Sequence, residues 1–199
     1  MKILLIGAGG TIGSAVDKEL SQRHEVIRIG RSSGDFQVDI SDSASIRKLF
    51  EQTGKFDALV CAAGNVTFAP LGEMTEDSFA LGLKDKLMGQ VNLLLIGREY
   101  ANDGASFTFT TGVLSHDPIR SGASAAMVNG ALDSFVRAAA IELPRGLRVN
   151  SVSPTVLTEA LGKYAPYFRG FKSVPAADAA LAYAKSVEGL QTGQTFHVG

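Results

Sequence analysis

A glycine-rich turn near the start of the chain carries the clearest chemical pattern in the sequence. It follows the apolar run 3–6 and precedes a segment, 11–20, with a helical pattern of apolar residues. Unpaired N–H groups and the dipole at a helix N-terminus together form an anion site. The G-x-x-G-x-x-G spacing differs from the dinucleotide fingerprint G-x-G-x-x-G only in its middle glycine, so we predict a dinucleotide pyrophosphate here, with an ordinary strand-to-helix turn as the alternative. The predicted contacts are Gly7, Gly9, Gly10, Thr11, Ile12 and Gly13.

A cation and two hydroxyl groups follow the second predicted strand, at Arg31, Ser32 and Ser33. In a doubly wound sheet the end of this strand faces the adenine ribose. An acidic residue there binds the 2′-hydroxyl, whereas an arginine accommodates a 2′-phosphate. No acid precedes Arg31, so we predict that NADP(H) is preferred over NAD(H). A solvated loop arginine is the alternative.

Composition limits the classes of protein that fit the chain. It has 199 residues, of which 45% are hydrophobic, and a formal net charge of −1. A chain of this length buries about 70% of its unfolded surface, so we predict one domain over residues 1–199. The charge balance argues against a nucleic-acid surface, and the absence of a long apolar run predicts no membrane span. The single Cys61 is typical of the cytoplasm, and three scattered histidines predict no metal site.

Strands and helices are expected to alternate along the chain and so to position these residues. Such alternation predicts an α/β, doubly wound (Rossmann-type) domain with a mostly parallel sheet and helices on both faces. The expected strands are 3–6, 25–29, 36–40, 57–64 with its small-residue turn, 106–111, 147–154 and 195–198. The expected helices are 11–20, 44–52, 75–101, 123–143 and one that starts at 175.

The ends of these helices follow from local sequence signals. Ser41 or Ser43 is the expected cap of the helix over 44–52, and Thr75 that of the long helix. The run 102–104 is expected to close the long helix, and Pro144 to stop the next one. The segment 158–172 is expected to be irregular.

Nearly the whole chain resembles the short-chain dehydrogenase/reductase family. The resemblance is carried, in order, by the glycine turn, 38–40, 57–60 leading to 62–64, 131–135 through 140–143, 147–150 and 192–194. It implies a domain that binds NAD or NADP, with Asp39 and Ile40 beside the adenine. It also implies that Ala62, Ala63 and Gly64 line the adenosine side.

The residues that the family uses for catalysis are changed in this chain. The family uses an Asn, a Ser and a Tyr-x-x-x-Lys pair, in which the lysine lowers the pKa of the tyrosine. An ungapped fit places Ala125 at the tyrosine and Asn129 at the lysine. Thr111 then takes the place of the serine and Lys86 that of the asparagine, so lysine and asparagine are exchanged. Pro154 is kept, but Thr155 replaces the glycine that follows it in the family.

Two functions are compatible with these changes. The first is an NADP(H)-dependent reductase of a small carbonyl compound, in which Thr111 binds the carbonyl oxygen and Lys86 beside Asn129 supplies positive charge. Water or a loop side chain (His116, Tyr164 or Tyr167) would then give the proton. The second is an inactive NADP(H)-binding protein, such as a redox sensor or an oligomer subunit. In that interpretation Ala125 marks a lost function and Lys86 is an ordinary surface lysine.

The two long predicted helices also suggest self-association. Helices 75–101 and 123–143 carry small and apolar residues on more than one face, which is typical of helices buried on more than one side. The family pairs the same two helices across a two-fold axis. We therefore expect a homo-oligomer, a dimer or a tetramer, whose other partner is a small-molecule substrate.

Overall fold

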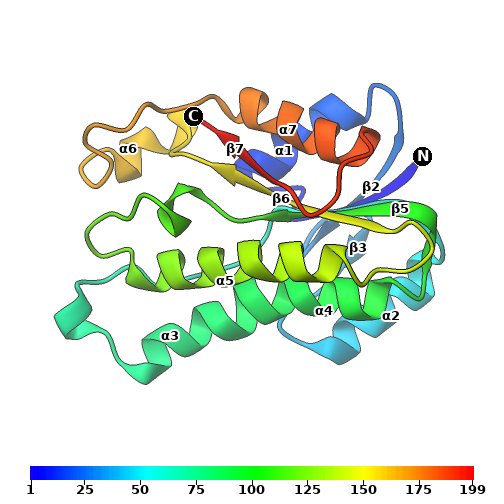
Figure 1. Cartoon of the computed structure of the whole chain (residues 1–199), viewed down its shortest axis with the longest axis horizontal. Helices are drawn as coiled ribbons and strands as arrows, with labels where there is room; N and C mark the ends of the chain where they lie inside the picture. The colour runs from blue at the N-terminus through cyan, green and yellow to red at the C-terminus, as the bar shows by residue number, and fades with distance from the viewer.

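The computed structural model describes residues 1–199 and contains one seven-stranded sheet in which all neighbouring strands are parallel (Figure 1). The strand order is β3-β2-β1-β4-β5-β6-β7, so the order reverses between β1 and β4. Such a reversal leaves a crevice at the carboxyl ends of the strands, where ligands bind in doubly wound folds. The strands are β1 (Lys2–Ile6), β2 (Glu25–Gly30), β3 (Phe36–Gln37), β4 (Phe56–Cys61), β5 (Ala101–Thr110), β6 (Arg148–Pro154) and β7 (Thr195–Val198).

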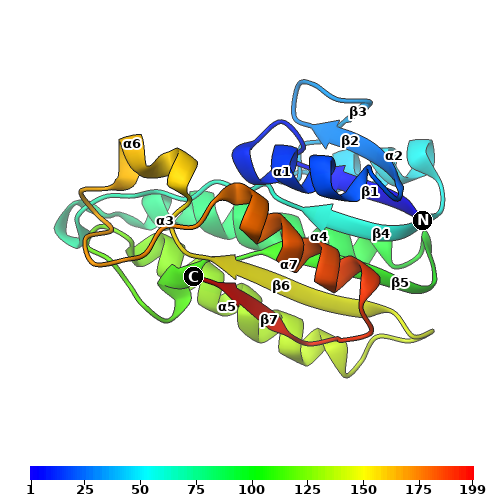
Figure 2. The ribbon, with the colours of Figure 1, turned by 90° about the horizontal axis from the view of Figure 1, so that it is seen from above.

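Helices cover both faces of the sheet, as the alternation of elements predicts. Figure 2, seen from above, shows α1 and α7 side by side over one face, while α2, α4 and α5 lie under the other. The helices are α1 (Thr11–Leu20), α2 (Ser43–Thr53), α3 (Glu76–Gly82), α4 (Met88–Gly97), α5 (Ala123–Ala140), α6 (Leu161–Tyr164) and α7 (Ala176–Glu188).

The side chains of β1 show why both faces must be covered. Ile3 and Leu5 lie in the core under α1 and α7, whereas Leu4 and Ile6 lie in the larger core on the opposite face. All four are fully buried or nearly so. Successive side chains of a strand point to opposite faces, so a strand that is apolar throughout needs helices on both sides.

The long helix expected over 75–101 is broken into segments and ends earlier. Thr75 caps α3, as predicted, but a π-helical segment (Leu83–Leu87) separates α3 from α4, which ends at Gly97. The residues expected to close the helix instead begin β5. The guanidinium of Arg145, from the α5–β6 connection, donates to the carbonyl of Ala101 at 2.9 Å. This partner is 44 residues away in the sequence, so no local signal reveals it.

Other predicted boundaries move by a few residues. Asp42, not Ser41 or Ser43, caps α2, because its carboxylate accepts the N–H of Ala44 at 2.9 Å. The Ser41 hydroxyl instead donates to Asp39. The expected strand 36–40 pairs with β2 only at its first two residues, since the Asp39 N–H donates to the Ser45 hydroxyl instead. α5 ends at residue 140 rather than 143, and the segment expected to be irregular contains α6.

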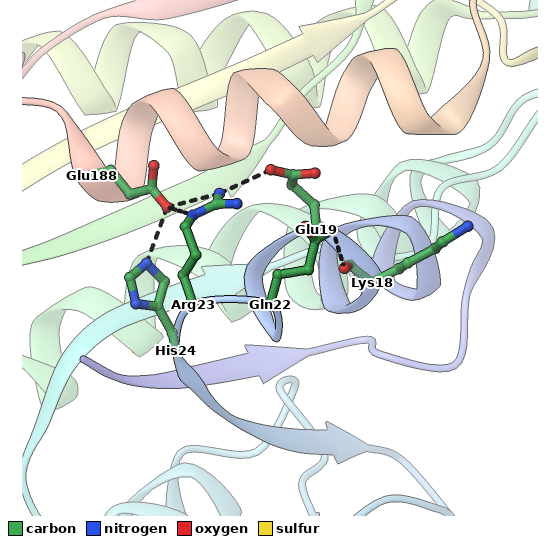
Figure 3. Close-up of polar contacts among 6 residues, drawn as sticks. All are labelled: Lys18, Glu19, Gln22, Arg23, His24 and Glu188. Carbon is green, nitrogen blue, oxygen red and sulfur yellow. Dashed lines mark hydrogen bonds and ion pairs between the residues drawn. The ribbon is translucent and has the colours of Figure 1, made fainter.

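A cluster of charged residues joins the C-terminal ends of α1 and α7 (Figure 3). The carboxylate of Glu188 accepts hydrogen bonds from Arg23 and from His24 Nε2, both at 3.0 Å, and Arg23 also pairs with Glu19 at 2.8 Å. These contacts tie two elements that are more than 160 residues apart. No helix in the structure has both the length and the apolar character needed to cross a membrane.

Candidate functional site

The glycine turn joins β1 to α1 where three elements meet. Gly7 has φ = +84° and donates its N–H to the Ile29 carbonyl of β2 at 2.8 Å. A Cβ atom on Gly7 would lie 2.7 Å from the Ala62 carbonyl oxygen, and one on Gly13 would collide with the Gly7 carbonyl. Both positions therefore require glycine, because backbone from β2, from the β4 connection and from α1 occupies the space of a side chain.

The N-terminus of α1 is open to a ligand. Gly9 and Gly10 are exposed, and no side chain caps the helix. The N–H groups of Thr11 and Ile12 donate to no protein acceptor. Unpaired donors at the positive end of a helix dipole bind phosphate groups. The turn therefore fits the pyrophosphate of a dinucleotide.

A hollow of about 90 Å³ follows the turn toward the edge of the sheet, and we call it the adenosine hollow. It collects residues from the ends of β1, β2 and β4 and from the connection after β3. Six predicted cofactor residues line it: Gly7, Arg31, Asp39, Ile40, Ala63 and Gly64. Ala62 packs against Gly7 from behind, and Ser32 lies exposed beside Arg31 without lining the hollow.

Arg31 forms an ion pair that the sequence analysis does not foresee. Its guanidinium donates to the Asp39 carboxylate at 2.9 Å, and both side chains are exposed. Hydrogen bonds from the Ser41 hydroxyl and N–H, with a further one from Arg31, hold the pKa of Asp39 below its ordinary value. Arg31 lies at the rim of the adenosine hollow, so a 2′-phosphate would compete with Asp39 for it.

A second hollow of about 260 Å³ lies beyond the ends of β5 and β6, and we call it the inner cavity. Its wall is mostly apolar. Ile12, from the first turn of α1, and Pro154, from the end of β6, both contribute to it. The three predicted catalytic residues, Thr111, Lys86 and Asn129, are among its polar residues, together with Thr155 and Tyr164.

Lys86 connects these polar groups. Its Nζ donates to Asn129 Oδ1 at 2.7 Å and to the Thr111 carbonyl oxygen at 3.2 Å. An ammonium has three donors, so one remains for a ligand. Asn129 and Thr111 are both buried, and the Thr111 hydroxyl makes only a long contact of 3.4 Å to the Val152 carbonyl. Ala125, one turn before Asn129, forms part of the wall.

The surroundings of Lys86 change its proton affinity. Burial lowers its pKa from 10.5 to about 8, against smaller opposing effects of Cys61 and Asp133. No acidic group lies within ion-pair distance of it. Lys86 is half-buried and lies in the π-helical segment, so the alternative of an ordinary solvated surface lysine does not apply. Such irregular helical turns are common at functional sites.

Sequence reasoning did not include Asn65 and Asp85 in the site. The buried Asp85 carboxylate accepts the backbone N–H of Asn65 at 2.9 Å and its side-chain N–H at 3.1 Å. Both residues line the adenosine hollow, and each directly adjoins a predicted site residue, Gly64 or Lys86. That adjacency is the only local signal. The pairing itself spans 20 residues.

The three loop residues considered as proton donors lie in different places. Tyr164 lines the inner cavity. Tyr167 is exposed outside it. His116 packs edge-on against His197, with 4.7 Å between ring centroids, in a different hollow. Only Tyr164 is placed to touch a ligand in the inner cavity.

Comparisons with known proteins identify the family. A family model described as enoyl-(acyl carrier protein) reductase matches residues 10–196. The chain belongs to the short-chain dehydrogenase/reductase family. Among the relatives of this dehydrogenase/reductase is carbonyl reductase [NADPH] 2 from Sus scrofa, which is 25% identical. That alignment covers 82% of this chain and 74% of the relative.

Solved structures of similar proteins share the whole fold. The protein lin1944 from Listeria innocua is 54% identical, with a TM-score of 0.99, and the match covers 100% of both chains. A small-chain dehydrogenase in complex with NADPH is 26% identical, with a TM-score of 0.88. That match covers 100% of this chain and 96% of the other. The Rossmann-type architecture predicted from the sequence is therefore confirmed.

Proposed function

We propose that this dehydrogenase/reductase uses NADPH to reduce a small aldehyde or ketone, with Lys86 as the proton donor. The observation that carries the proposal is the 2.7 Å contact between Lys86 Nζ and Asn129 Oδ1 beside Thr111, in a mostly apolar cavity that the first turn of α1 also borders. Lysine and asparagine have exchanged places relative to the family pattern, but their contact keeps a cation at the site.

Each polar residue has a separate role in this proposal. When bound, the reduced nicotinamide supplies the hydride. The Thr111 hydroxyl donates a hydrogen bond to the carbonyl oxygen and orients it. The ammonium of Lys86 gives that oxygen a proton and regains one from solvent, while Asn129 holds Nζ in place. A pKa of about 8 makes this transfer easier than it is from a lysine at its ordinary 10.5.

The preference for NADPH in this proposal depends on Arg31. The relative from Sus scrofa carries NADPH in its name, and the structure at 26% identity contains NADPH. In this chain Arg31 lies at the rim of the adenosine hollow and can exchange its exposed carboxylate partner for a phosphate. A charge-assisted contact of this kind favours the phosphorylated cofactor.

The pH dependence of turnover tests the role of Lys86. NADPH consumption is measured against aldehydes, ketones and quinones between pH 6 and 10. We expect reduction to fall about tenfold per pH unit above pH 8, because only the ammonium can donate. Oxidation of the corresponding alcohols is expected to be slow and to rise through the same pH. Fast alcohol oxidation at neutral pH, or reduction that is independent of pH, would contradict the proposal.

A specific observation also favours a second function, an NADP(H)-binding protein without turnover. Ala125 places a methyl group in the wall of the inner cavity where the family has its tyrosine, and the phenol of Tyr164 comes from a different element. Consistent failure to consume NADPH, together with tight NADPH binding, would support this alternative. The triple variant Ala125→Tyr, Asn129→Lys, Lys86→Asn restores the family set around Thr111 and should gain alcohol oxidation. The same variant with Lys86 retained places two cations side by side and serves as the control.

We also propose that the protein self-associates through α4 and α5. Met88 and Leu95 on α4 and Met127 on α5 are apolar, and each is exposed by more than 40%. Covering such side chains in an interface removes apolar surface from water. Light scattering at micromolar concentration tests this, and a strictly monomeric species would contradict it.

A further inference from the structure

The inner cavity adjoins a larger outer hollow of about 900 Å³. The two meet at Val66, Phe68 and Tyr164, which line both. The rings of Phe68 and Tyr164 pack against each other at this boundary, with 6.2 Å between their centroids. The outer hollow lies among the connections that follow β4, β5 and β6, beyond the carboxyl ends of the strands (Figure 1).

The outer hollow is positively charged. Two cationic side chains, Arg120 and Lys163, line it together with the phenol rings of Tyr164 and Tyr167, and no acidic residue does. Neither cation has a carboxylate within 4.0 Å, whereas Arg23, Arg28, Arg31 and Arg145 all form ion pairs. Lys163 Nζ lies 5.1 Å from the centre of the Tyr164 ring. Two unpaired cations at one opening attract an anion.

The backbone around Arg120 is held in an unusual conformation. Ser121, the next residue, has φ = +65°, which non-glycine residues rarely adopt. Its carbonyl accepts the N–H of Ala69 at 3.2 Å, so the connections after β4 and β5 are joined at this point. Strained backbone of this kind is concentrated at ligand sites. The conformation fixes the point from which Arg120 extends into the hollow.

We propose that the substrate is an aldehyde or ketone that carries a carboxylate or phosphate group on an apolar or aromatic body. This inference rests on the proposed reductase function. The carbonyl lies at Lys86 and Thr111, the body passes Phe68 and Tyr164, and the anion lies between Arg120 and Lys163. The anion takes no part in the reaction, in which NADPH gives a hydride to the carbonyl carbon and its oxygen takes a proton.

Matched substrates test the inference by turnover. They are 4-carboxybenzaldehyde, its methyl ester and 4-formylphenyl phosphate, each assayed with NADPH at low ionic strength. We expect kcat/KM for the acid to exceed that for the ester by tenfold or more, and the preference to shrink with added salt. The double variant Arg120→Ala, Lys163→Ala should reduce the preference below threefold, and because acid and ester are compared within the same variant, a general change in turnover cancels. A higher kcat/KM for the phosphate than for the carboxylate would assign the site to a phosphate group.

The matched control is Arg169→Ala, which removes an exposed cation of the same connection that does not line the hollow. It should keep the full preference. Equal kcat/KM for acid and ester, or a preference that the double variant retains, overturns the inference and leaves the reductase proposal standing.

A binding measurement separates failure of the inference from failure of the reductase proposal. Calorimetry compares 4-(hydroxymethyl)benzoate with its methyl ester in the presence of NADP⁺. Tighter binding of the acid, lost in the double variant, supports the anion site even if no carbonyl is reduced, and only the reductase proposal then falls. If the protein shows no turnover and binds the acid no more tightly than the ester, the inference is overturned.

Discussion

Lys86 and Arg23 are two cations in opposite surroundings. Arg23 lies exposed between two carboxylates, Glu19 and Glu188, whose hydrogen bonds raise its pKa (Figure 3). Lys86 is half-buried, its partners are the neutral Asn129 and a backbone carbonyl, and burial lowers its pKa to about 8. A cation whose charge is fully paired gains little from a ligand. One that is held without a counter-charge binds or donates to whatever enters its cavity.

Arg23 and Lys86 also have opposite effects on the stability of the fold. The contacts of Arg23 join α1 to α7 and favour the native state. Desolvation raises the pKa of Glu188, but the hydrogen bonds from Arg23 and His24 outweigh it and leave that pKa below its ordinary value. Burying the charge of Lys86 instead opposes folding near neutral pH, because the native state disfavours its charged form. A residue that opposes folding is a candidate for function.

The largest expected effect is the loss of turnover when Lys86 is replaced. Lys86→Met keeps much of the side-chain volume but removes the proton donor. We expect kcat for carbonyl reduction to fall 10²- to 10⁴-fold, about 3–5 kcal/mol in the barrier, because this is the usual contribution of a general acid. Arg23→Met is the matched control and should leave kcat unchanged. Equal activity of Lys86→Met and the unmodified protein would remove Lys86 from the reaction.

Arg31 provides an intermediate case, since its charge is paired and exposed but close to the adenosine hollow. We expect Arg31→Ala to weaken NADPH binding about tenfold or more, roughly 1.5–3 kcal/mol, and to leave NADH binding unchanged. Calorimetric titration of both cofactors measures this. Arg28→Ala removes a similar exposed pair, with Asp17, and should change neither affinity. Equal affinity of the unmodified protein for NADPH and NADH would contradict the prediction.

The stability of the fold should depend on pH through Lys86. Its native pKa of about 8 lies below the ordinary 10.5, so the native state holds fewer protons between these values and stability rises with pH across that window. The expected gain is about 1–3 kcal/mol. Urea unfolding at pH 7.5 and 9.5 measures it as a difference from Lys86→Met, which cancels the other titrating groups. The same pH dependence in both proteins would show that Lys86 is solvated.

The smallest expected effect concerns Glu188, which pairs with the exposed Arg23. Its pKa is lowered in the native state, so its stabilising contribution is present above its ordinary pKa and is lost as the pH falls through the native one. We expect Glu188→Gln to cost at most about 1 kcal/mol at pH 7, because the group is partly exposed, and to cost less at pH 3. Thermal unfolding at both pH values is the measurement, and an equal loss at both would show that packing, not charge, is responsible.

The sequence predicted most of the elements correctly because their signals are local. The apolar run of β1, the glycine turn and the alternation of strands and helices require no knowledge of distant residues. Errors arose where a distant partner decides the local structure, as at the start of β5, which Arg145 holds. Such contacts outweigh the local helix-forming tendency of the sequence.

The site was predictable in part, for the same reason. The family resemblance predicted that Thr111, Lys86 and Asn129 share one site, and in the structure all three line one cavity. The pairing of Arg31 with Asp39 and the low pKa of Lys86 depend on neighbours and on burial, which a linear pattern does not contain. The catalytic and cofactor roles of these residues remain predictions.

The π-helical segment at 83–87 sets the directions in which the side chains of α3 and α4 point relative to each other. Each residue of an α-helix advances the side chains by about 100°, so one residue accommodated in a wider turn rotates everything before it relative to everything after it. The segment therefore acts as a phase shift. It allows α3 to meet α5 while α4 meets α2, although the two run on as nearly one rod. Deletion of a single residue there would remove the rotation between α3 and α4. Either α5 or α2 would then face side chains of this helix that do not fit it.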